Sequence, residues 1–241
     1  MPVDLKDTFD TYNRRARLYP AFLAVLPAAV FVVLLWKNSP LQALGPVLVA
    51  VGGLFFLANF VRTLGRRLET RLITQWDGLP TTHLLRHRET KNPVQLGRWH
   101  AKLSRVTGID MPSEQDETAN PSGADNTYIA ATRALIPLVR DAPDDFPRVQ
   151  EENVNYGFRR NLLGLKAIGL TLVSVCLVID IAVAVFGAVS VQLVVTAGIQ
   201  LLVLLMWLVF VNATWVFEAG QTYAERLFEA LEKLDTAPKK Q

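Results

Sequence analysis

The segment AIGLTLVSVCLVIDIAVAVFGAVSVQLVVTAGIQLLVLLMWLVFVNATWVF, residues 167 to 217, carries one charged side chain, Asp180. It is too long for a single membrane span, because about 20 apolar residues already cross a hydrocarbon core of about 30 Å. The small residues of FGAVSVQ, residues 186 to 192, offer a turn near its middle. We therefore expect two transmembrane helices here, at 167 to 187 and 190 to 215.

Two more uncharged stretches lie near the start of the chain, PAFLAVLPAAVFVVLLW at 20 to 36 and LQALGPVLVAVGGLFFLANFV at 41 to 61. The first lacks a small-residue cleavage site, so we expect it to be retained rather than removed as a signal peptide. The prediction is an all-α membrane protein with four transmembrane helices in two hairpins. The first hairpin occupies 20 to 61, with spans at 20 to 36 and 42 to 61, and the second occupies 167 to 217.

The cations that flank the expected spans predict the orientation of the chain, since positive flanks stay in the cytoplasm. The outer turns hold one cation, Lys37, whereas the inner flanks hold many: Lys6, Arg14, Arg15, Arg17, Arg62, Arg66, Arg67, Arg71, Arg159, Arg160 and Lys166. We expect a multi-pass protein of the cell inner membrane, with both termini and a helical domain at 62 to 166 in the cytoplasm.

The two ends of the chain read as helices outside the membrane. Within residues 1 to 19, apolar side chains recur every three or four residues at Leu5, Phe9, Tyr12, Ala16 and Tyr19. This stripe predicts an interfacial amphipathic helix on the inner membrane surface, and packing on the cytoplasmic domain is the alternative. Residues 218 to 241 predict a C-terminal helix and tail that continue the fourth span and join subunits or dock on the insert.

The cytoplasmic insert reads as a series of helices without strand alternation. The helix of the second span continues to Trp76, and DGLP at 77 to 80 ends it. Thr81 or Thr82 then caps a short helix, THLLRHRE.

A second helix of the insert opens at Asn92 as the cap with Pro93 at its first position, and it closes at Gly108. The acidic stretch 110 to 123 reads as a flexible loop. Residues 124 to 141 predict a last helix of the insert, bent at Pro137.

The insert is electrically divided. Residues 65 to 105 hold nine cations and three anions, a net charge of +6, and residues 106 to 157 hold three cations and ten anions, a net charge of −7. The basic part mixes cations with aromatic rings, which is what phosphate contact and base stacking require. It yields eight candidate ligand-binding residues: His83, Arg86, His87, Arg88, Arg98, Trp99, Lys102 and Arg105. Three interpretations stay open, namely a nucleotide or short oligonucleotide ligand, an anionic lipid headgroup, and salt bridges between the two halves.

Catalysis finds little support in the sequence. The chain has no Gly-rich phosphate loop and no Gly-x-Ser-x-Gly elbow, and its one cysteine excludes an intrachain disulfide. His83 and His87 would share one face of a helix, but a zinc site needs three or four ligands. We therefore expect no enzyme, no cofactor and no metal. A lipid or nucleotide enzyme built on the three histidines ranks below the other hypotheses.

Asp180 is the unusual residue of the second hairpin, because intramembrane carboxylates are costly and face a bundle interior or water. Gln200 on the last span is placed to face it. In a homo-oligomer, with a tetramer as the best guess, one Asp180 from each subunit would form a cation-selective ring in a pore. A single buried carboxylate hydrogen-bonded to the last span is the alternative.

The joint between the insert and the third span carries the motif Tyr156-Gly157-Phe158-Arg159-Arg160. The preference for cations at the cytoplasmic end of a span is enough to explain Arg159 and Arg160. The further hypothesis is a coupling collar, hinged at Gly157, through which the insert acts on the span that carries Asp180.

Three stretches together resemble a known group of proteins: GLPTTHLLRH at 78 to 87, NPSGADNTYIAATRALIPLVRD at 120 to 141, and ENVNYGFRRNLLGLK at 152 to 166. They are similar to small bacterial four-span membrane effectors of antiphage defence loci, some encoded near nucleotidyltransferases. The resemblance implies an effector whose cytoplasmic part senses the product of a partner nucleotidyltransferase and whose oligomerised spans breach the membrane. The function expected is an oligomeric effector or ion channel embedded in membrane lipid, and the alternative is a non-conducting scaffold that recruits proteins or anionic lipid.

Overall fold

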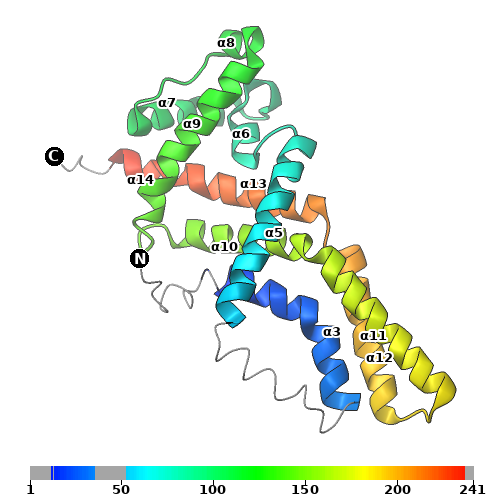
Figure 1. The fold of residues 1–241 in the computed structure, drawn as a ribbon. Helices are drawn as coiled ribbons and strands as arrows, with labels where there is room; N and C mark the ends of the chain where they lie inside the picture. Colours follow the sequence, from blue (N-terminus) through cyan, green and yellow to red (C-terminus); the bar gives the residue numbers. More distant parts are fainter. Residues whose placement is uncertain (1–11, 13, 36–52, 237–241) are drawn as a thin grey trace. The chain divides into compact units, whose positions relative to one another are not determined.

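The computed structural model describes residues 12, 14 to 35 and 53 to 236 (Figure 1). Every regular element in these ranges is a helix, which confirms the all-α prediction for the described part of the chain. The contacts divide the chain into two compact units. We call Met1–Arg71 with Gly157–Val216 the apolar unit, and Leu72–Tyr156 with Phe217–Gln241 the polar unit.

Three helices in the described ranges are long and apolar enough to cross a membrane: Arg14–Val32, Lys166–Phe186 and Val191–Val209. They contain α3 (Tyr19–Leu35), α11 (Lys166–Phe186) and α12 (Val191–Val209), which pack on one another. The first of the three begins with a short π-helical segment, Arg14–Leu18. The expected span at 42 to 61 and most of the expected helix at 1 to 19 lie outside the described residues.

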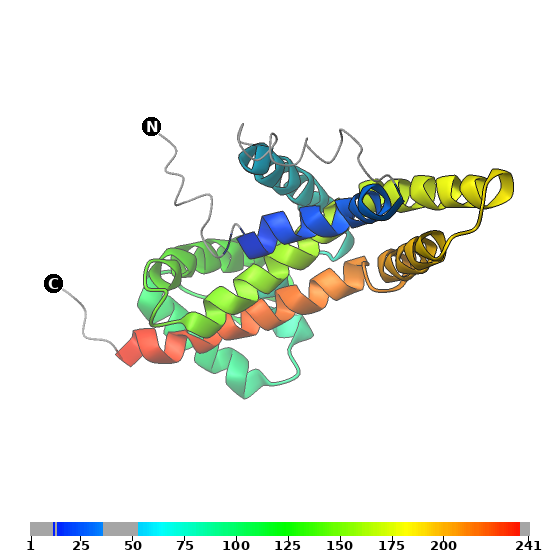
Figure 2. The ribbon, with the colours of Figure 1, turned by 90° about the horizontal axis from the view of Figure 1, so that it is seen from below.

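The hairpin of α11 and α12 has its turn where the sequence predicts it (Figure 2). Ser190 caps α12, because its side chain accepts a hydrogen bond from the Leu193 amide at 3.2 Å. Most side chains of the hairpin point outward, and Phe186 is 89% exposed. An apolar exterior of this kind suits a hydrocarbon environment, since a water-soluble protein rarely exposes so large an apolar surface.

The last span is shorter than expected, and the prediction of a helix continuing to the C-terminal segment is wrong. Helix α12 ends at Val209, and α13 (Ala213–Glu229) begins after a break. The cause is Asn212, whose side-chain oxygen accepts a hydrogen bond from the Trp215 amide at 2.9 Å and so caps α13. A second interruption at Ala230 separates α13 from α14 (Leu231–Thr236).

Close packing at one glycine sets the register of the hairpin. A Cβ atom on Gly169 would lie 2.4 Å from the Trp207 indole, which is itself fully buried. Only glycine therefore fits at this position of α11. Counting outward from this contact along two antiparallel helices places Asp180 level with Thr196, and Gln200 level with Cys176.

Three more helices contribute to the apolar unit, and the first four residues of α13 are part of it, up to Val216. Helix α5 (Gly53–Gln75) and helix α10 (Pro147–Gly164) each contain a boundary between the units, at Arg71 and at Gly157 respectively. Helix α10 ends one residue before α11 begins, and Leu165 stands between them.

The core of the polar unit joins its helices around Tyr128, Leu135 and Phe228, all fully buried. The elements between α5 and α10 are α6 (Pro80–Leu85), the 3-10 turn η2 (His87–Glu89), α7 (Pro93–Thr107), α8 (Glu114–Ala119) and α9 (Pro121–Arg140). Helix α9 contacts α6, α7 and α8, and α14 contacts α7.

Several local predictions in the polar unit are confirmed. The DGLP turn ends α5, with φ of 58° at Asp77 and 139° at Gly78. Asn92 caps α7 by accepting a hydrogen bond from the Gln95 amide, and Gly108 closes that helix in the left-handed conformation.

Three other local predictions are wrong. Thr81 and Thr82 do not cap a helix, because α6 begins at Pro80 and both threonines are buried inside it. The segment expected as a flexible loop contains α8, which a reciprocal capping box between Ser113 and Asp116 stabilises. The helix expected over THLLRHRE ends at Leu85, since Arg86 is extended.

The packing of Gly169 against Trp207 gives a first test. Replacing Gly169 with Leu should destabilise the protein by roughly 1 to 3 kcal/mol or more, because an overpacked core must shift its side chains. Gly198→Leu is the matched control on the same hairpin, since a Cβ there meets nothing within 4 Å. The measurement is the melting temperature in detergent, and equal losses in both variants would contradict this packing.

Candidate functional site

Arg86 forms the centre of the polar unit's electrostatics. Its side chain is 2% exposed, and its guanidinium donates to both carboxylate oxygens of Asp125, at 2.9 and 2.6 Å. It also donates to Glu89 at 2.5 Å and to the Asp77 carbonyl at 2.6 Å. The hydrogen bonds with Asp125 and Glu89 raise the pKa of Arg86 despite its burial. The guanidinium is thus fully engaged by the protein.

The tight turn before α6 is shaped to this guanidinium. A Cβ atom on Gly78 would lie 2.9 Å from Arg86 Nη2, and the φ of 139° at Gly78 favours glycine independently. The turn presents the Asp77 carbonyl that Arg86 binds. The Asp77-Gly78 turn therefore has two roles. It ends α5, and it positions the carbonyl that accepts a hydrogen bond from Arg86.

Glu117 is a second centre, buried at 3% exposure. Its carboxylate accepts hydrogen bonds from the His87 amide at 2.8 Å, the Arg88 guanidinium at 2.9 Å and the Tyr128 hydroxyl at 2.7 Å. Burial acts to raise the pKa of Glu117, but these donors outweigh it and lower the pKa below its usual value. The Arg88 guanidinium also pairs with Asp125 at 3.4 Å.

Two of the remaining predicted cations pair with the C-terminal helix. Arg98 and Lys102 on α7 both form ion pairs with Glu232 of α14, the first at 3.0 Å. Lys102 and Arg98 lower the pKa of Glu232. Arg105 donates to the Ala101 carbonyl within its own helix.

These pairs show how the two oppositely charged halves of the insert meet. Arg86 and Arg88 come from the basic half, and Asp125 and Glu117 come from the acidic half. The salt-bridging interpretation of the basic stretch thus describes the geometry of four predicted cations: Arg86, Arg88, Arg98 and Lys102.

The three histidines occupy different surroundings. His83 Nδ1 donates to Glu89 at 2.5 Å, whereas His87 Nε2 donates to the Pro112 carbonyl at 3.1 Å. His100 is buried and donates to the Leu85 carbonyl at 2.9 Å, and burial lowers its pKa. His83 and His87 do not share a helix face, because α6 ends between them. The described residues contain no group of side chains suited to hold a metal ion.

A cavity of about 420 Å³ brings two of the predicted ligand residues together in the polar unit, His83 and Trp99. The indole of Trp99 packs on Phe228 at 5.4 Å between ring centroids. His83 Nε2 and Trp99 Nε1 are both buried and have no hydrogen-bond partner in the described part of the chain. Buried nitrogens of this kind are nearly always satisfied in proteins, so these two groups are the unusual feature of the residues that line the cavity.

The other polar groups around this cavity come from two places in the chain. They are Glu89, Thr90, Lys91, Asn92 and Gln95 near the start of α7, together with Gln221 and Glu225 of α13. The sequence did not single out Asn92 and Gln95 as ligand residues, although they adjoin the basic stretch. Gln221 and Glu225 carry no signal in the sequence, since only the fold brings α13 beside α6 and α7.

A second polar cluster lies inside the apolar unit. Asp180 is 3% exposed and Gln200 is fully buried, on the facing sides of α11 and α12. Neither carboxylate oxygen of Asp180 and neither side-chain amide atom of Gln200 has a hydrogen-bond partner among the described residues. Thr196, also buried, donates to the Gln192 carbonyl at 2.8 Å. The predicted pore residues thus face the interior of the helix packing. Asp180 lies level with Thr196, and Gln200 lies level with Cys176.

The predicted coupling residues are all engaged within their own units. In the apolar unit Arg159 lies 4.8 Å over the Trp215 ring and donates to the Trp215 carbonyl at 2.9 Å, and Arg160 pairs with Glu69 at 2.9 Å. The ring of Phe158 meets the edge of Trp215 at 6.4 Å. In the polar unit Tyr156 stacks on Tyr223 at 6.5 Å.

Gly157 allows close packing rather than a break in the helix. A Cβ atom there would lie 2.9 Å from the Tyr12 hydroxyl and 3.2 Å from the Ala16 Cβ. Helix α10 runs through this position, and the interruption of the chain falls at Leu165 instead. The hinge expected at Gly157 is therefore not a break in secondary structure.

Comparison with protein-family models, with curated proteins and with solved structures finds no match for this chain.

The Glu117 centre predicts how stability depends on pH. Because the folded-state pKa of Glu117 is lowered, its contribution is fully present above the unfolded value of 4.5 and is lost as pH falls through the folded value. Glu117→Gln should therefore melt below the wild type at pH 7, and the difference should shrink when the pH falls below about 4.5. A difference in melting temperature that stays constant down to pH 3 would contradict this role.

Proposed function

We propose that this chain is a homo-oligomeric effector of the bacterial inner membrane that passes cations through its apolar helices, under the control of a nucleotide-derived ligand bound by the polar unit. The orientation keeps both termini and the polar unit in the cytoplasm, following the cations at the inner flanks. Antiphage defence is the setting that the sequence resemblance implies.

The observation that carries the proposal is the pair Asp180 and Gln200. A carboxylate and an amide, both buried between apolar helices without hydrogen-bond partners in the described residues, are costly to maintain. Such groups in membrane helices recur on the paths of ions and protons, where they replace part of an ion's hydration shell. An apolar side chain at either position would pack the hairpin at lower cost, so conduction gives a reason for the polar pair.

The cavity beside Trp99 supports control by a ligand. It combines an aromatic ring, a cation at Lys91, and amide groups at Asn92, Gln95 and Gln221. These are the groups that stack on a base, bind a phosphate and read a base edge. The volume of about 420 Å³ falls within the range of small-molecule sites.

One observation favours the alternative of a non-conducting scaffold. Asp180 and Gln200 are buried within the helix packing of a single chain, where polar side chains also act as interhelical hydrogen-bonding groups. In that case the apolar unit anchors the chain, and the polar unit recruits its partners. Flux measurements separate the two functions.

The test is potassium efflux from liposomes that contain the purified, oligomeric protein, measured with and without cyclic mononucleotides and cyclic dinucleotides. Asp180→Asn and Gln200→Leu should each lower the ligand-dependent efflux. A hydrogen bond to a charged group is worth roughly 1.5 to 3 kcal/mol, so the expected loss is about tenfold or more. Gln192→Leu is the matched control, because Gln192 is an exposed glutamine on the same helix.

Efflux that is unchanged in both variants would remove the polar pair from the conduction path. Absence of efflux from a confirmed oligomer with every nucleotide tried would reject the channel and leave the scaffold. Trp99→Phe keeps the ring on Phe228 and removes the free N–H group, so it should weaken the response to the nucleotide without changing the assembly.

A further inference from the structure

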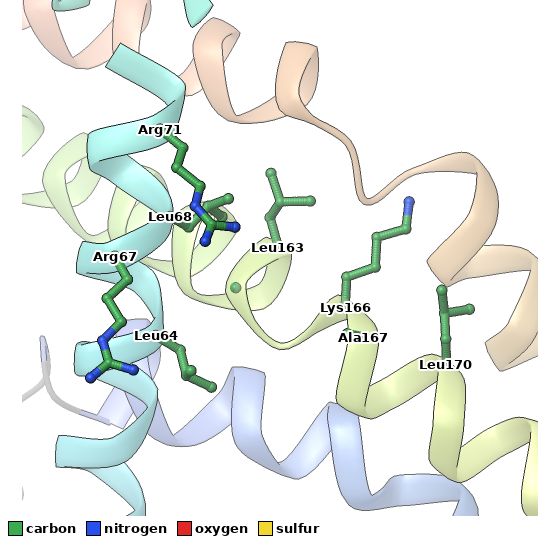
Figure 3. Close-up of a pocket in the computed structure, with 9 residues that line it drawn as sticks. Leu64, Arg67, Leu68, Arg71, Leu163, Lys166, Ala167 and Leu170 are labelled. Carbon is green, nitrogen blue, oxygen red and sulfur yellow. The ribbon is translucent and has the colours of Figure 1, made fainter. Parts of the chain in front are cut away.

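The apolar unit holds a second cavity, of about 570 Å³, lined by α5, the end of α10 and the start of α11 (Figure 3). Its lining contains three cations, Arg67 and Arg71 from α5 and Lys166 from α11, and is otherwise mostly leucine. Neither the proposed conduction path nor the ligand cavity of the polar unit uses these residues. The combination of cations and aliphatic side chains in one cavity requires a separate explanation.

Close packing of α5 against α10 builds one side of this cavity. A Cβ atom on Gly164 would lie 3.1 Å from the Gly65 amide nitrogen, and one on Gly65 would lie 2.0 Å from the Asn161 side-chain oxygen. The ion pair of Arg160 with Glu69 holds the same crossing of α5 and α10, and Asn161 donates a hydrogen bond from α10 to the Ala16 carbonyl of the π-helical segment Arg14–Leu18. The crossing is thus fixed by backbone contact and by an ion pair.

The two arginines on α5 remain available to a ligand. Arg67 and Arg71 are exposed, and neither forms an ion pair in the described part of the chain. Figure 3 shows the Arg71 side chain extending over Leu68 toward Leu163. Two guanidinium groups one helical turn apart can bind one phosphate, since each offers a planar pair of donors.

Lys166 adds a third positive charge at the start of a candidate membrane helix. Its ammonium donates to the Val211 carbonyl at 2.6 Å, which leaves two donors free. In the orientation proposed above, the start of the apolar stretch of α11 places this part of the cavity at the level of the inner-leaflet headgroups.

The apolar lining extends from the same position into the span. Leu64 and Leu68 come from α5, Leu163 comes from α10, and Leu170 lies one turn into α11. Aliphatic side chains add nothing to the binding of a free phosphate, whereas a lipid chain buries apolar area against them. The ligand that matches both parts of the lining is an amphiphile with a negatively charged head.

We propose that this cavity binds one anionic phospholipid, with its phosphate on Arg67 and Arg71 and its upper acyl chain along Leu64, Leu68 and Leu170. Basic pockets beside membrane helices on the cytoplasmic side are typical sites for anionic headgroups. The bound lipid joins α5 to the start of α11 across the interruption at Leu165. The proposal requires the membrane setting but not the conduction of ions.

The test is lipid occupancy measured by native mass spectrometry on delipidated full-length protein in detergent, titrated with a short-chain phosphatidylglycerol. The double variant Arg67→Gln/Arg71→Gln should weaken binding by roughly fivefold for each cation removed, about 25-fold in total. The matched control is Arg62→Gln/Arg66→Gln, which removes equal charge from the same helix. These two arginines lie near Arg17, which they repel, and not in the cavity.

Three comparisons identify the ligand. Phosphatidylcholine with the same chains should bind at least about tenfold more weakly than phosphatidylglycerol, because its head carries no net charge. Glycerol phosphate should not displace the lipid, since it lacks the acyl chains. Ala167→Phe, which leaves every cation in place, should lower lipid occupancy by filling the apolar part of the cavity.

Equal weakening by the control double variant would mean a diffuse positive surface and would overturn the proposal. Displacement of the lipid by glycerol phosphate at equal concentration would assign the site to soluble phosphates instead. Equal binding of phosphatidylcholine would assign it to acyl chains alone and would also overturn the proposal.

Discussion

The burial of Asp180 and Gln200 between two apolar helices is the constraint on which the rest of the apolar unit depends. Because Gly169 admits the Trp207 indole, the register of α11 against α12 places these two side chains one helical turn apart, with Asp180 level with Thr196 and Gln200 level with Cys176. Elsewhere the hairpin exposes apolar side chains and buries one narrow face of each helix. A carboxylate at the centre of such a helix pair is costly to bury.

In the polar unit, by contrast, the buried charged side chains have partners. Arg86 and Glu117 are each surrounded by groups of opposite charge or by donors, and the basic and acidic halves of the insert meet through them. Breaking such buried pairs is costly, because the remaining charge stays buried without compensation. These residues therefore organise the helices, and the His83 Nε2 and Trp99 Nε1 atoms are left without a hydrogen-bond partner in the described part of the chain.

Local signals in the sequence predicted much of this structure, and long-range packing decided the rest. Asn92 and Gly108 mark the ends of α7 correctly, because caps and left-handed glycines act within a few residues. Asn212 carries the same kind of signal, yet a long apolar run before it favoured a continuous helix over a cap. The ligand cavity includes Gln221 and Glu225, more than a hundred residues from Trp99, and no spacing in the sequence indicates that they meet.

Conduction past Asp180 requires water to reach the buried faces of α11 and α12. The thiol of Cys176 can report on that water. Cys176, the single cysteine, lies one turn from Asp180 on the buried face of α11, level with Gln200. The most direct measurement is the reaction of Cys176 with a small, charged methanethiosulfonate reagent in liposomes, with unfolded protein as the control for thiol reactivity. If ions pass beside Asp180, Cys176 reacts under the conditions that support efflux and is protected when efflux is absent. A thiol that stays unmodified during efflux would contradict a water-filled path at this level of the hairpin.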